Sequence, residues 1–383
     1  MGSKGLTGLD RYLLGSLSRK VARHAFCSMS VVRRSVDKGE GPMVWLEGLV
    51  PWAIFLLSAA VIVYAGTKLS GYGDQLAKLT GLGGLWIGVV LMAAATSLPE
   101  VFTTVSAGWL NAPDLAAGDL FGAGMSNMLT LGLIDLLHRQ KRVWQQAALG
   151  HTLTAALAMV LTGLAAFFVL LPANVTHAGV GLGSLILLVL YVLGMRVIFR
   201  QEDMEHRQRE REALVEGTMV KQDAASRRAE LRRAIIGFSV CALILLVAAP
   251  FLAWSAQRIA EETGTTATFI GTSLVAITTS LPELVVAIGA VRLGAFDLAV
   301  GNLFGSNAFN MAAFLFADLA YREGGLLSSV SSTHALTALW SILMMNIGLM
   351  GIIYRAEKRF MLIEPDSLLM IASYVLGLWL LFK

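Results

Sequence analysis

Residues 95–100 read ATSLPE, and residues 278–283 read TTSLPE. Each run places a glutamate, Glu100 or Glu283, directly after a proline and inside a long apolar segment. Proline lacks the N–H group that a helix needs, and a charged side chain inside a membrane is costly unless it has a partner. A pattern that combines these two disadvantages and occurs twice indicates a functional site.

The composition places the chain in a lipid bilayer. Of its 383 residues, 56% are hydrophobic and 15% are charged, whereas soluble proteins carry about 25% charged residues. The apolar residues fall in blocks that are long enough to cross a bilayer. We therefore predict an all-α polytopic membrane protein with ten transmembrane helices. The predicted spans lie near 43–66, 80–110, 114–137, 146–171, 176–199, 234–256, 266–292, 296–320, 328–354 and 366–382.

The two motifs belong to an internal repeat. Glu283 follows Glu100 at an offset of 183 (283 − 100), and at this offset segments 87–128 and 270–311 share 21 identities in 42 ungapped positions. Gene duplication accounts for this similarity. The matching spans are five apart, an odd number, so they cross the membrane in opposite directions. Inverted repeats with interrupted helices are typical of secondary transporters, and we predict two inverted five-helix repeats.

Hydrophilic stretches divide the chain into four parts. These are a basic N-terminal arm at 1–42, a first five-helix repeat at 43–199, a charged linker at 200–233 that is helical in part, and a second five-helix repeat at 234–383. The repeated core of each half extends over about 84–137 and about 267–320.

Basic residues concentrate in the odd-numbered loops, and the positive-inside rule places those loops in the cytoplasm. The basic arm disagrees with this orientation. It is interpreted as an interfacial amphipathic helix or as a targeting segment. The Ala- and Gly-rich chain favours a plasma membrane, and the arm leaves an organelle membrane open.

The proline and the glutamate together suit a cation. Pro99 cannot donate to the carbonyl of Ala95, and the released carbonyl needs another partner in hydrocarbon. Hydroxyl groups flank each glutamate. Carbonyl, hydroxyl and carboxylate oxygens are the ligands that hard cations such as Ca²⁺ prefer. The candidate hydroxyl ligands are Thr96, Ser97, Thr279 and Ser280.

The second part of each repeat reads GDLFGAGMSNM at 118–128 and GNLFGSNAFNM at 301–311. Asn127 and Asn310 offer uncharged oxygens to the same site. Small residues allow close helix contact, which is the role predicted for four glycines. These are Gly118, Gly122, Gly301 and Gly305.

Four aspartates accompany the motifs. Asp114 and Asp297 stand where two spans begin, and we predict helix N-caps rather than ion contacts there. Asp135 and Asp318 each lie eight residues beyond an asparagine, about 12 Å along a helix. They are predicted to line two vestibules, with surface salt bridges as the alternative.

The paired motifs resemble those of the cation/calcium antiporter superfamily, which includes the sodium/calcium exchangers. The resemblance implies alternating access, with spans 1 and 6 sliding past the other helices. It also implies a set of ion ligands in each repeat. The implied ligands are the Ala93 carbonyl, Thr96, Ser97, Glu100 and Asn127, and then the Ala276 carbonyl, Thr279, Ser280, Glu283, Ser306 and Asn310.

The chain departs from the family pattern at three positions. Ala123 replaces a usual serine, Gly124 replaces a frequent asparagine, and Asn310 stands where several members carry aspartate. Two glutamates remain, which neutralise one Ca²⁺ but hold a full set of sodium ions less easily. Exchange of Ca²⁺ for Na⁺ through one midplane site, the function that the family resemblance implies, is nevertheless the predicted function. Exchange of Ca²⁺ or another divalent cation for H⁺ through the same glutamates is the alternative.

Other classes of protein fit less well. A cation channel is disfavoured by the inverted repeat, and an intramembrane enzyme by the absence of HExxH and GxSxG motifs. We predict no cofactor. We also predict no nucleic-acid partner, because the net charge of the chain is only +4. Cys27 and Cys241 are interpreted as ordinary apolar residues. The expected partners are the bilayer and the transported cations, and no oligomeric state is predicted.

Overall fold

A computed structural model describes residues 42–80, 83–137, 150–171, 176–177, 180–215, 224–262, 279–354 and 365–381. The chain divides into two units, Met1–Trp45 and Leu46–Lys383, and nearly all of the described helices lie in the second unit. The basic arm up to residue 41, Cys27, the basic segment 138–142 and Ala276 lie outside the described residues.

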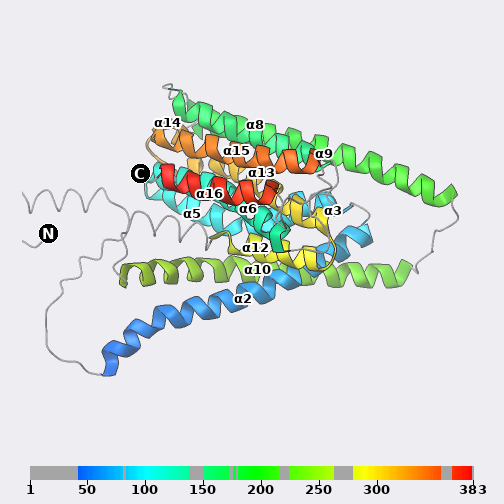
Figure 1. Ribbon diagram of the computed structural model, residues 1–383, viewed down its shortest axis with the longest axis horizontal. Helices are drawn as coiled ribbons and strands as arrows, with labels where there is room; N and C mark the ends of the chain where they lie inside the picture. The colour runs from blue at the N-terminus through cyan, green and yellow to red at the C-terminus, as the bar shows by residue number, and fades with distance from the viewer. Residues whose placement is uncertain are drawn as a thin grey trace, which may run out of the picture. The chain divides into compact units, whose positions relative to one another are not determined.

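The described residues are almost entirely helical (Figure 1). The longer helices are α2 (Pro42–Thr80), α5 (Leu98–Trp109), α6 (Pro113–Leu137), α8 (His151–Leu170), α9 (Leu182–Val215), α10 (Ala224–Glu262), α12 (Leu281–Arg292), α13 (Phe296–Ala320), α15 (Thr333–Tyr354) and α16 (Pro365–Leu381). The shorter elements are α3 (Gly83–Trp86), the π-helix η1 (Ile87–Met92), α4 (Ala93–Thr96), α14 (Leu326–Ser329) and the antiparallel strands β1 (Thr176–His177) and β2 (Val180–Gly181).

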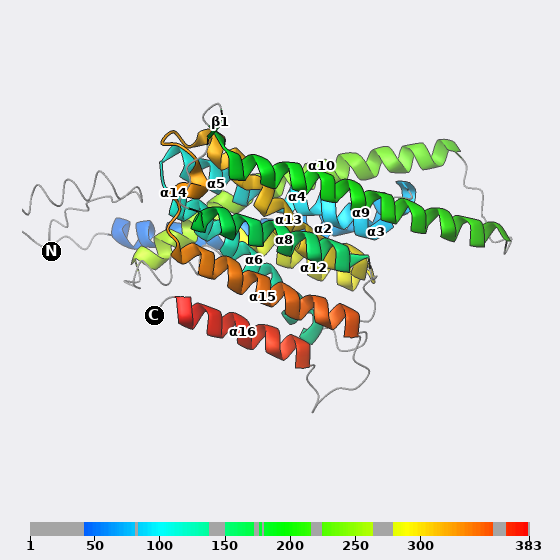
Figure 2. The same ribbon diagram turned by 90° about the horizontal axis from the view of Figure 1, so that it is seen from above.

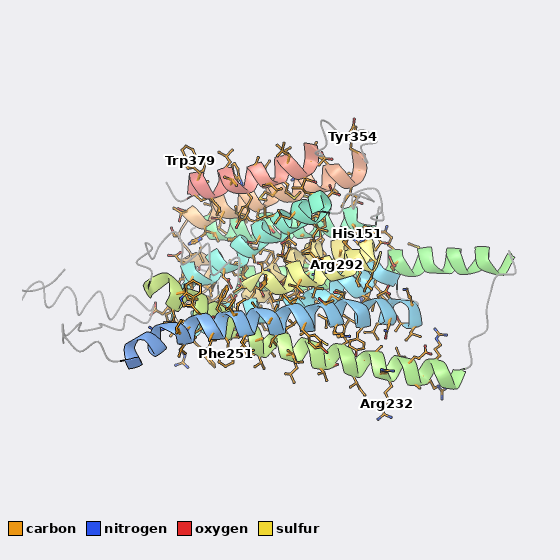
Figure 3. All side chains as sticks on the ribbon, turned by 60° about the horizontal axis from the view of Figure 1, so that its bottom comes forward. His151, Arg232, Phe251, Arg292, Tyr354 and Trp379 are labelled. Carbon is orange, nitrogen blue, oxygen red and sulfur yellow. The ribbon has the colours of Figure 1, made fainter. Side chains whose placement is uncertain are left out.

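The predicted class of polytopic helical membrane protein is confirmed. Within the described ranges, six helices are long and apolar enough to cross a membrane, or seven if one bent pair counts as a single span. Large apolar side chains on the outside of the unit face away from the core. Figure 3 shows Phe251 on one outer side and Tyr354 and Trp379 on the opposite one, and all three are more than half exposed. Such a surface is unfavourable in water and suits lipid.

Helix α13 forms the centre of the unit. Its apolar window is 83% buried, whereas the windows of α2, α9, α10 and α15 are only 22–39% buried. It contacts α5, α6, α8, α9, α12 and η1. Helices α2 and α10 lie side by side along one side of this centre, with α15 and α16 on another (Figures 1 and 2). The amino-acid pattern agrees, because α13 carries Asn302, Asn307 and Asn310, whereas α2, α9 and α10 contain no asparagine.

The helix boundaries recur along the chain at an almost constant offset. Helices α12 and α13 begin and end at the repeat offset from α5 and α6 (281 − 98 and 296 − 113). Helix α16 follows α9 at the same offset (365 − 182), and α10 and α15 follow α2 and α8 at an offset one smaller (224 − 42 and 333 − 151). Helices α6 and α13 run in opposite directions in Figures 1 and 2.

Three predicted span boundaries were wrong. Helix α2 continues to Thr80 instead of ending near residue 66, and a 2.6 Å ion pair between Lys78 and Asp74 lies on its polar extension. Helix α9 begins at Leu182 rather than 176, because β1 and β2 form a short hairpin there. The predicted span 328–354 is interrupted, since α14 ends at Ser329 and the extended backbone of Val330 precedes α15.

The charged linker is helical wherever the structure describes it, as predicted. Helix α9 continues to Val215 and α10 starts at Ala224, so the linker extends both spans beyond their apolar parts. Cys241 is a buried free thiol within α10, in agreement with its interpretation as a small apolar residue.

Candidate functional site

A helix begins directly after the serine of each TSLPE motif, and in the first motif the preceding helix α4 ends just before that serine. Ser97 has φ −87° and ψ 5°, and Ser280 has φ −81° and ψ 4°. The helical axis bends by 50° between the segments 87–96 and 98–109. Each proline follows at the second position of the new helix, where its missing N–H removes no intrahelical bond. The proline therefore fixes where the new helix starts.

The break places each glutamate in the first turn of a helix. Glu100 is the third residue of α5, and Glu283 is the third residue of α12. Both are 1% exposed. The partial positive charge of a helix N-terminus favours a carboxylate, so the broken helices partly offset the cost of burying these groups. A continuous helix would not supply this stabilisation.

The structure brings the two motifs together, although nearly half of the chain separates them in sequence. The hydroxyl of Ser97 donates a hydrogen bond of 3.1 Å to Oε1 of Glu283. The hydroxyl of Thr96 lies 3.3 Å from Oδ1 of Asn302 on α13. The first motif thus contacts both halves of the second repeat.

The predicted ligands are buried, yet many of their oxygens lack partners. All ten that lie in the described residues are at most 4% exposed. Buried polar groups in proteins are nearly always hydrogen-bonded, so seven unpartnered atoms among the predicted ligands favour a role of these residues in ligand binding. The unpartnered atoms are Glu100 Oε2, Glu283 Oε2, Asn127 Oδ1, Ser280 Oγ, Ser306 Oγ, and both Oδ1 and Nδ2 of Asn310.

The chemistry of these donors suits a hard cation. They are carboxylate, hydroxyl and amide oxygens, the set that Na⁺ and Ca²⁺ prefer over sulfur and imidazole ligands. No group of three or more His, Cys, Asp or Glu side chains that could hold a metal ion occurs in the described part of the chain. A cation here would therefore depend on neutral oxygens as much as on carboxylates. The Ala93 carbonyl accepts the Ser97 N–H at 3.0 Å, and the Thr96 hydroxyl lies 3.3 Å from the same oxygen.

The asparagines join the two central helices. Asn127 Nδ2 on α6 donates to Oδ1 of Asn307 on α13 at 2.8 Å, and Asn307 Nδ2 reaches the carbonyl of Gly124 at 3.4 Å. This bond leaves Asn127 Oδ1 available, as the predicted ligand role requires. Asn307 was not singled out in the sequence, although it lies between Ser306 and Asn310.

The repeated glycines allow the close packing that was predicted. A Cβ atom on Gly305 would lie 2.5 Å from the carbonyl oxygen of Val89, and one on Gly301 would lie 3.1 Å from that of Leu85. A Cβ atom on Gly118 would meet the ring of His334 at 3.3 Å. Helix α13 therefore crosses α3 and η1 with almost direct backbone contact.

The predicted N-cap roles of Asp114 and Asp297 were wrong. Ala295 is the N-cap of α13 and makes no side-chain cap bond, and Asp297 instead lies 3.1 Å from Nε2 of the buried His151. Figure 3 labels His151 at the start of α8. Asp114 accepts the N–H of Ser331 at 2.6 Å and lies 3.6 Å from Nε2 of His334. Both aspartates thus link helices of opposite repeats, which helix-start patterns alone do not reveal.

The predicted roles of Asp135 and Asp318 were also wrong. Asp135 is 4% exposed and accepts a hydrogen bond of 2.6 Å from the hydroxyl of Ser367. Asp318 is fully buried and accepts the N–H groups of Leu326 at 2.8 Å and Gly181 at 2.9 Å. Neither is a vestibule residue or a surface salt bridge. Asp318 satisfies the otherwise free donor at the start of α14.

A third acidic residue near the site was missed in the sequence. Asp119 on α6 is 8% exposed, and its Oδ2 lies 3.5 Å from the hydroxyl of Thr104 on α5. The repeat offset pairs Asp119 with Asn302. A difference of charge between paired positions of a repeat was the signal that could have identified it.

Comparison with known proteins identifies relatives of this chain. The family model described as sodium/calcium exchanger protein matches residues 50–199 and 233–383. The inner membrane protein YrbG of Escherichia coli is 29% identical over 267 residues, which cover 70% of this chain and 78% of the relative. The putative antiporter CaxA of Alkalimonas amylolytica is 26% identical over 272 residues, covering 70% and 79%.

A solved structure of the sodium-calcium exchanger NCX_Mj shares the fold. It aligns with a TM-score of 0.66 and 18% identity, and the alignment covers 87% of this chain and 99% of that one. Residues 1–33 separately match the model described as universal stress protein family. The exchanger model matches more than three quarters of the chain, so the chain belongs to the sodium/calcium exchanger protein family and is a multi-pass membrane antiporter of cations.

Proposed function

We propose that this antiporter exchanges Ca²⁺ for Na⁺ by alternating access at one site near the middle of the membrane. The observation that carries the proposal is the 3.1 Å hydrogen bond from Ser97 to Glu283, which joins the two motifs. Unpartnered oxygens of Glu100 and Glu283 are buried beside it. A Ca²⁺ ion at this point would be neutralised by two carboxylates and coordinated further by hydroxyl and amide oxygens.

The proposed ligands are those implied by the motifs. The glutamates supply charge, and neutral side chains complete the coordination. The neutral ligands are Thr96, Ser97, Asn127, Thr279, Ser280, Ser306 and Asn310, with the carbonyls of Ala93 and Ala276. All of these residues except Ala276 are described and buried, and Ala276 lies outside the described residues.

The proposed architecture is a pair of inverted five-helix repeats, at 43–199 and 234–383, joined by the linker 200–233. Support comes from the helix boundaries, which recur at or within one position of the repeat offset, and from the opposite directions of α6 and α13. In such an arrangement a site between the repeats is reached from either side by similar movements. We propose that α2 and α10, the first helix of each repeat, move past the central helices.

The proposed orientation places the odd-numbered loops in the cytoplasm. The ends of α9 and α12 and the start of α10 lie at the same end of the unit in Figures 1 and 2. Arg200 follows the apolar part of α9, Arg227 lies in the first turn of α10, and Arg292 ends α12. Clustering of basic residues at one end is what the positive-inside rule requires of cytoplasmic loops. A plasma membrane is the proposed location.

The coupling ion decides between the two candidate functions. Purified protein in proteoliposomes is tested for uptake of ⁴⁵Ca²⁺ driven by an outward Na⁺ gradient, or by an outward H⁺ gradient without Na⁺. Uptake driven only by Na⁺ is expected. Uptake driven by H⁺ alone would replace the proposal with Ca²⁺/H⁺ exchange, and uptake without any counter-ion would contradict antiport of Ca²⁺.

A further inference from the structure

Asp119 is a buried carboxylate without a cationic partner among the described residues. It lies on α6 and is 8% exposed. Its Oδ2 lies 3.5 Å from the hydroxyl of Thr104, a long contact for a hydrogen bond. That hydroxyl also donates to the carbonyl oxygen of Glu100, and a single hydroxyl hydrogen serves one acceptor at a time. Burying a charge with so little compensation is costly, so the ionised carboxylate needs a cation nearby.

Asp119 is placed to act with both glutamates. Helix α6 packs against α5, which carries Glu100, and against α12, which carries Glu283. A third carboxylate, besides the two glutamates, therefore lies on a helix that is adjacent to both α5 and α12.

Only the first copy of the repeat carries this charge. The position paired with Asp119 is Asn302 on α13, which is fully buried and has Oδ1 3.3 Å from the hydroxyl of Thr96. Its Nδ2 has no partner. Thr96 belongs to the proposed ion site, so the Asn302 position borders that site. Asp119 approaches the site through a different residue, Thr104, whose hydroxyl donates to the carbonyl oxygen of the proposed ligand Glu100.

We propose that Asp119 supplies a third negative charge to the transport site and so determines how much cation charge the site carries. This inference rests on the proposed function. With Asp119 ionised, the two glutamates and the aspartate match three monovalent cations, whereas a single Ca²⁺ leaves one negative charge. Asp119 is a specificity-determining residue that acts through the electric field beside the ion, since its carboxylate does not join the glutamates in one metal-binding group.

The test compares four proteins in proteoliposomes: wild type, Asp119→Asn, the double variant Asp119→Asn/Asn302→Asp, and Asp135→Asn. Asp135→Asn is the matched control, because it removes another buried carboxylate from the same helix, one bonded to Ser367. The measured quantities are the Ca²⁺ concentration that gives half-maximal uptake and the steepness of the Na⁺ dependence.

For Asp119→Asn we expect the half-saturating Ca²⁺ concentration to rise about tenfold, since one charge nearby is worth at least that factor in a poorly solvated site. The Na⁺ dependence should become less steep. The double variant, which moves the carboxylate to the paired position, should return both quantities toward wild type. Asp135→Asn should leave both unchanged even if its thermal stability falls.

Unchanged cation dependence in Asp119→Asn would overturn the inference. So would a double variant as defective as the single one, because a packing role is not restored by moving a charge. If Asp119→Asn does not fold, the cation dependence of the double variant, compared with that of wild type, decides. A wild type that takes up Ca²⁺ only with H⁺ refutes the Na⁺ proposal, while the Ca²⁺ half-saturation of Asp119→Asn still tests this inference.

Discussion

Substitution of Gly305 by alanine tests the close crossing on which the site depends. The new Cβ atom would lie 2.5 Å from the carbonyl oxygen, 2.6 Å from Cα and 2.9 Å from the carbonyl carbon of Val89. All three atoms belong to the backbone of η1, so no side chain can move aside. Overpacking of this kind costs about 1–3 kcal/mol, and alanine recovers about 1 kcal/mol of helix propensity. We expect a net destabilisation of up to about 2 kcal/mol.

The assay is thermal unfolding in detergent, combined with ⁴⁵Ca²⁺ uptake. A lower unfolding temperature is expected, together with a larger loss of uptake, because η1 leads directly into the ligands of α4. Gly71→Ala is the matched control, since a Cβ atom there meets nothing within 4 Å in helix α2. It should be as stable as wild type or more so. A Gly305→Ala protein with wild-type stability and uptake would refute the reasoning.

Two further substitutions test separate contacts. Ser97→Ala removes the 3.1 Å bond to Glu283. Because a hydrogen bond to a charged group contributes about 1.5–3 kcal/mol, the half-saturating Ca²⁺ concentration should rise by about tenfold or more, and unchanged uptake would count against a shared site. Asp318→Asn weakens the acceptor for the N–H groups of Leu326 and Gly181. It should lower the unfolding temperature and leave the Ca²⁺ dependence of uptake unchanged, and a shift in that dependence would contradict its structural role.

Much of the fold followed from local patterns in the sequence. Apolar blocks predicted a membrane class, and the prolines of the two TSLPE motifs predicted the starts of α5 and α12 and the break before α5. The constant offset between the repeats predicted helix pairs whose boundaries the structure repeats, including α6 with α13. These features lie in short runs of residues, or in the repetition of such runs along the chain, so a single sequence displays them.

Features that depend on packing between distant segments were not predictable in this way. The contact of His151 with Asp297 joins two helices that are far apart in sequence, and each residue is unremarkable by itself. Asp318 is close to Leu326 in sequence, but the turn that brings them together is not visible there. Asp119 was missed for another reason. The paired position is Asn302, so the two copies of the repeat differ there, and a comparison of identical positions does not include it.

The central claim is that the two broken helices contribute one glutamate each to a single Ca²⁺ site. Equilibrium binding of ⁴⁵Ca²⁺ to the purified protein tests it most directly, with Glu100→Gln and Glu283→Gln beside the exposed Glu323→Gln as control. We predict one Ca²⁺ per chain for wild type and for the control, and loss of high-affinity binding in each of the other two variants. Wild-type affinity in either Glu100→Gln or Glu283→Gln would contradict the shared site.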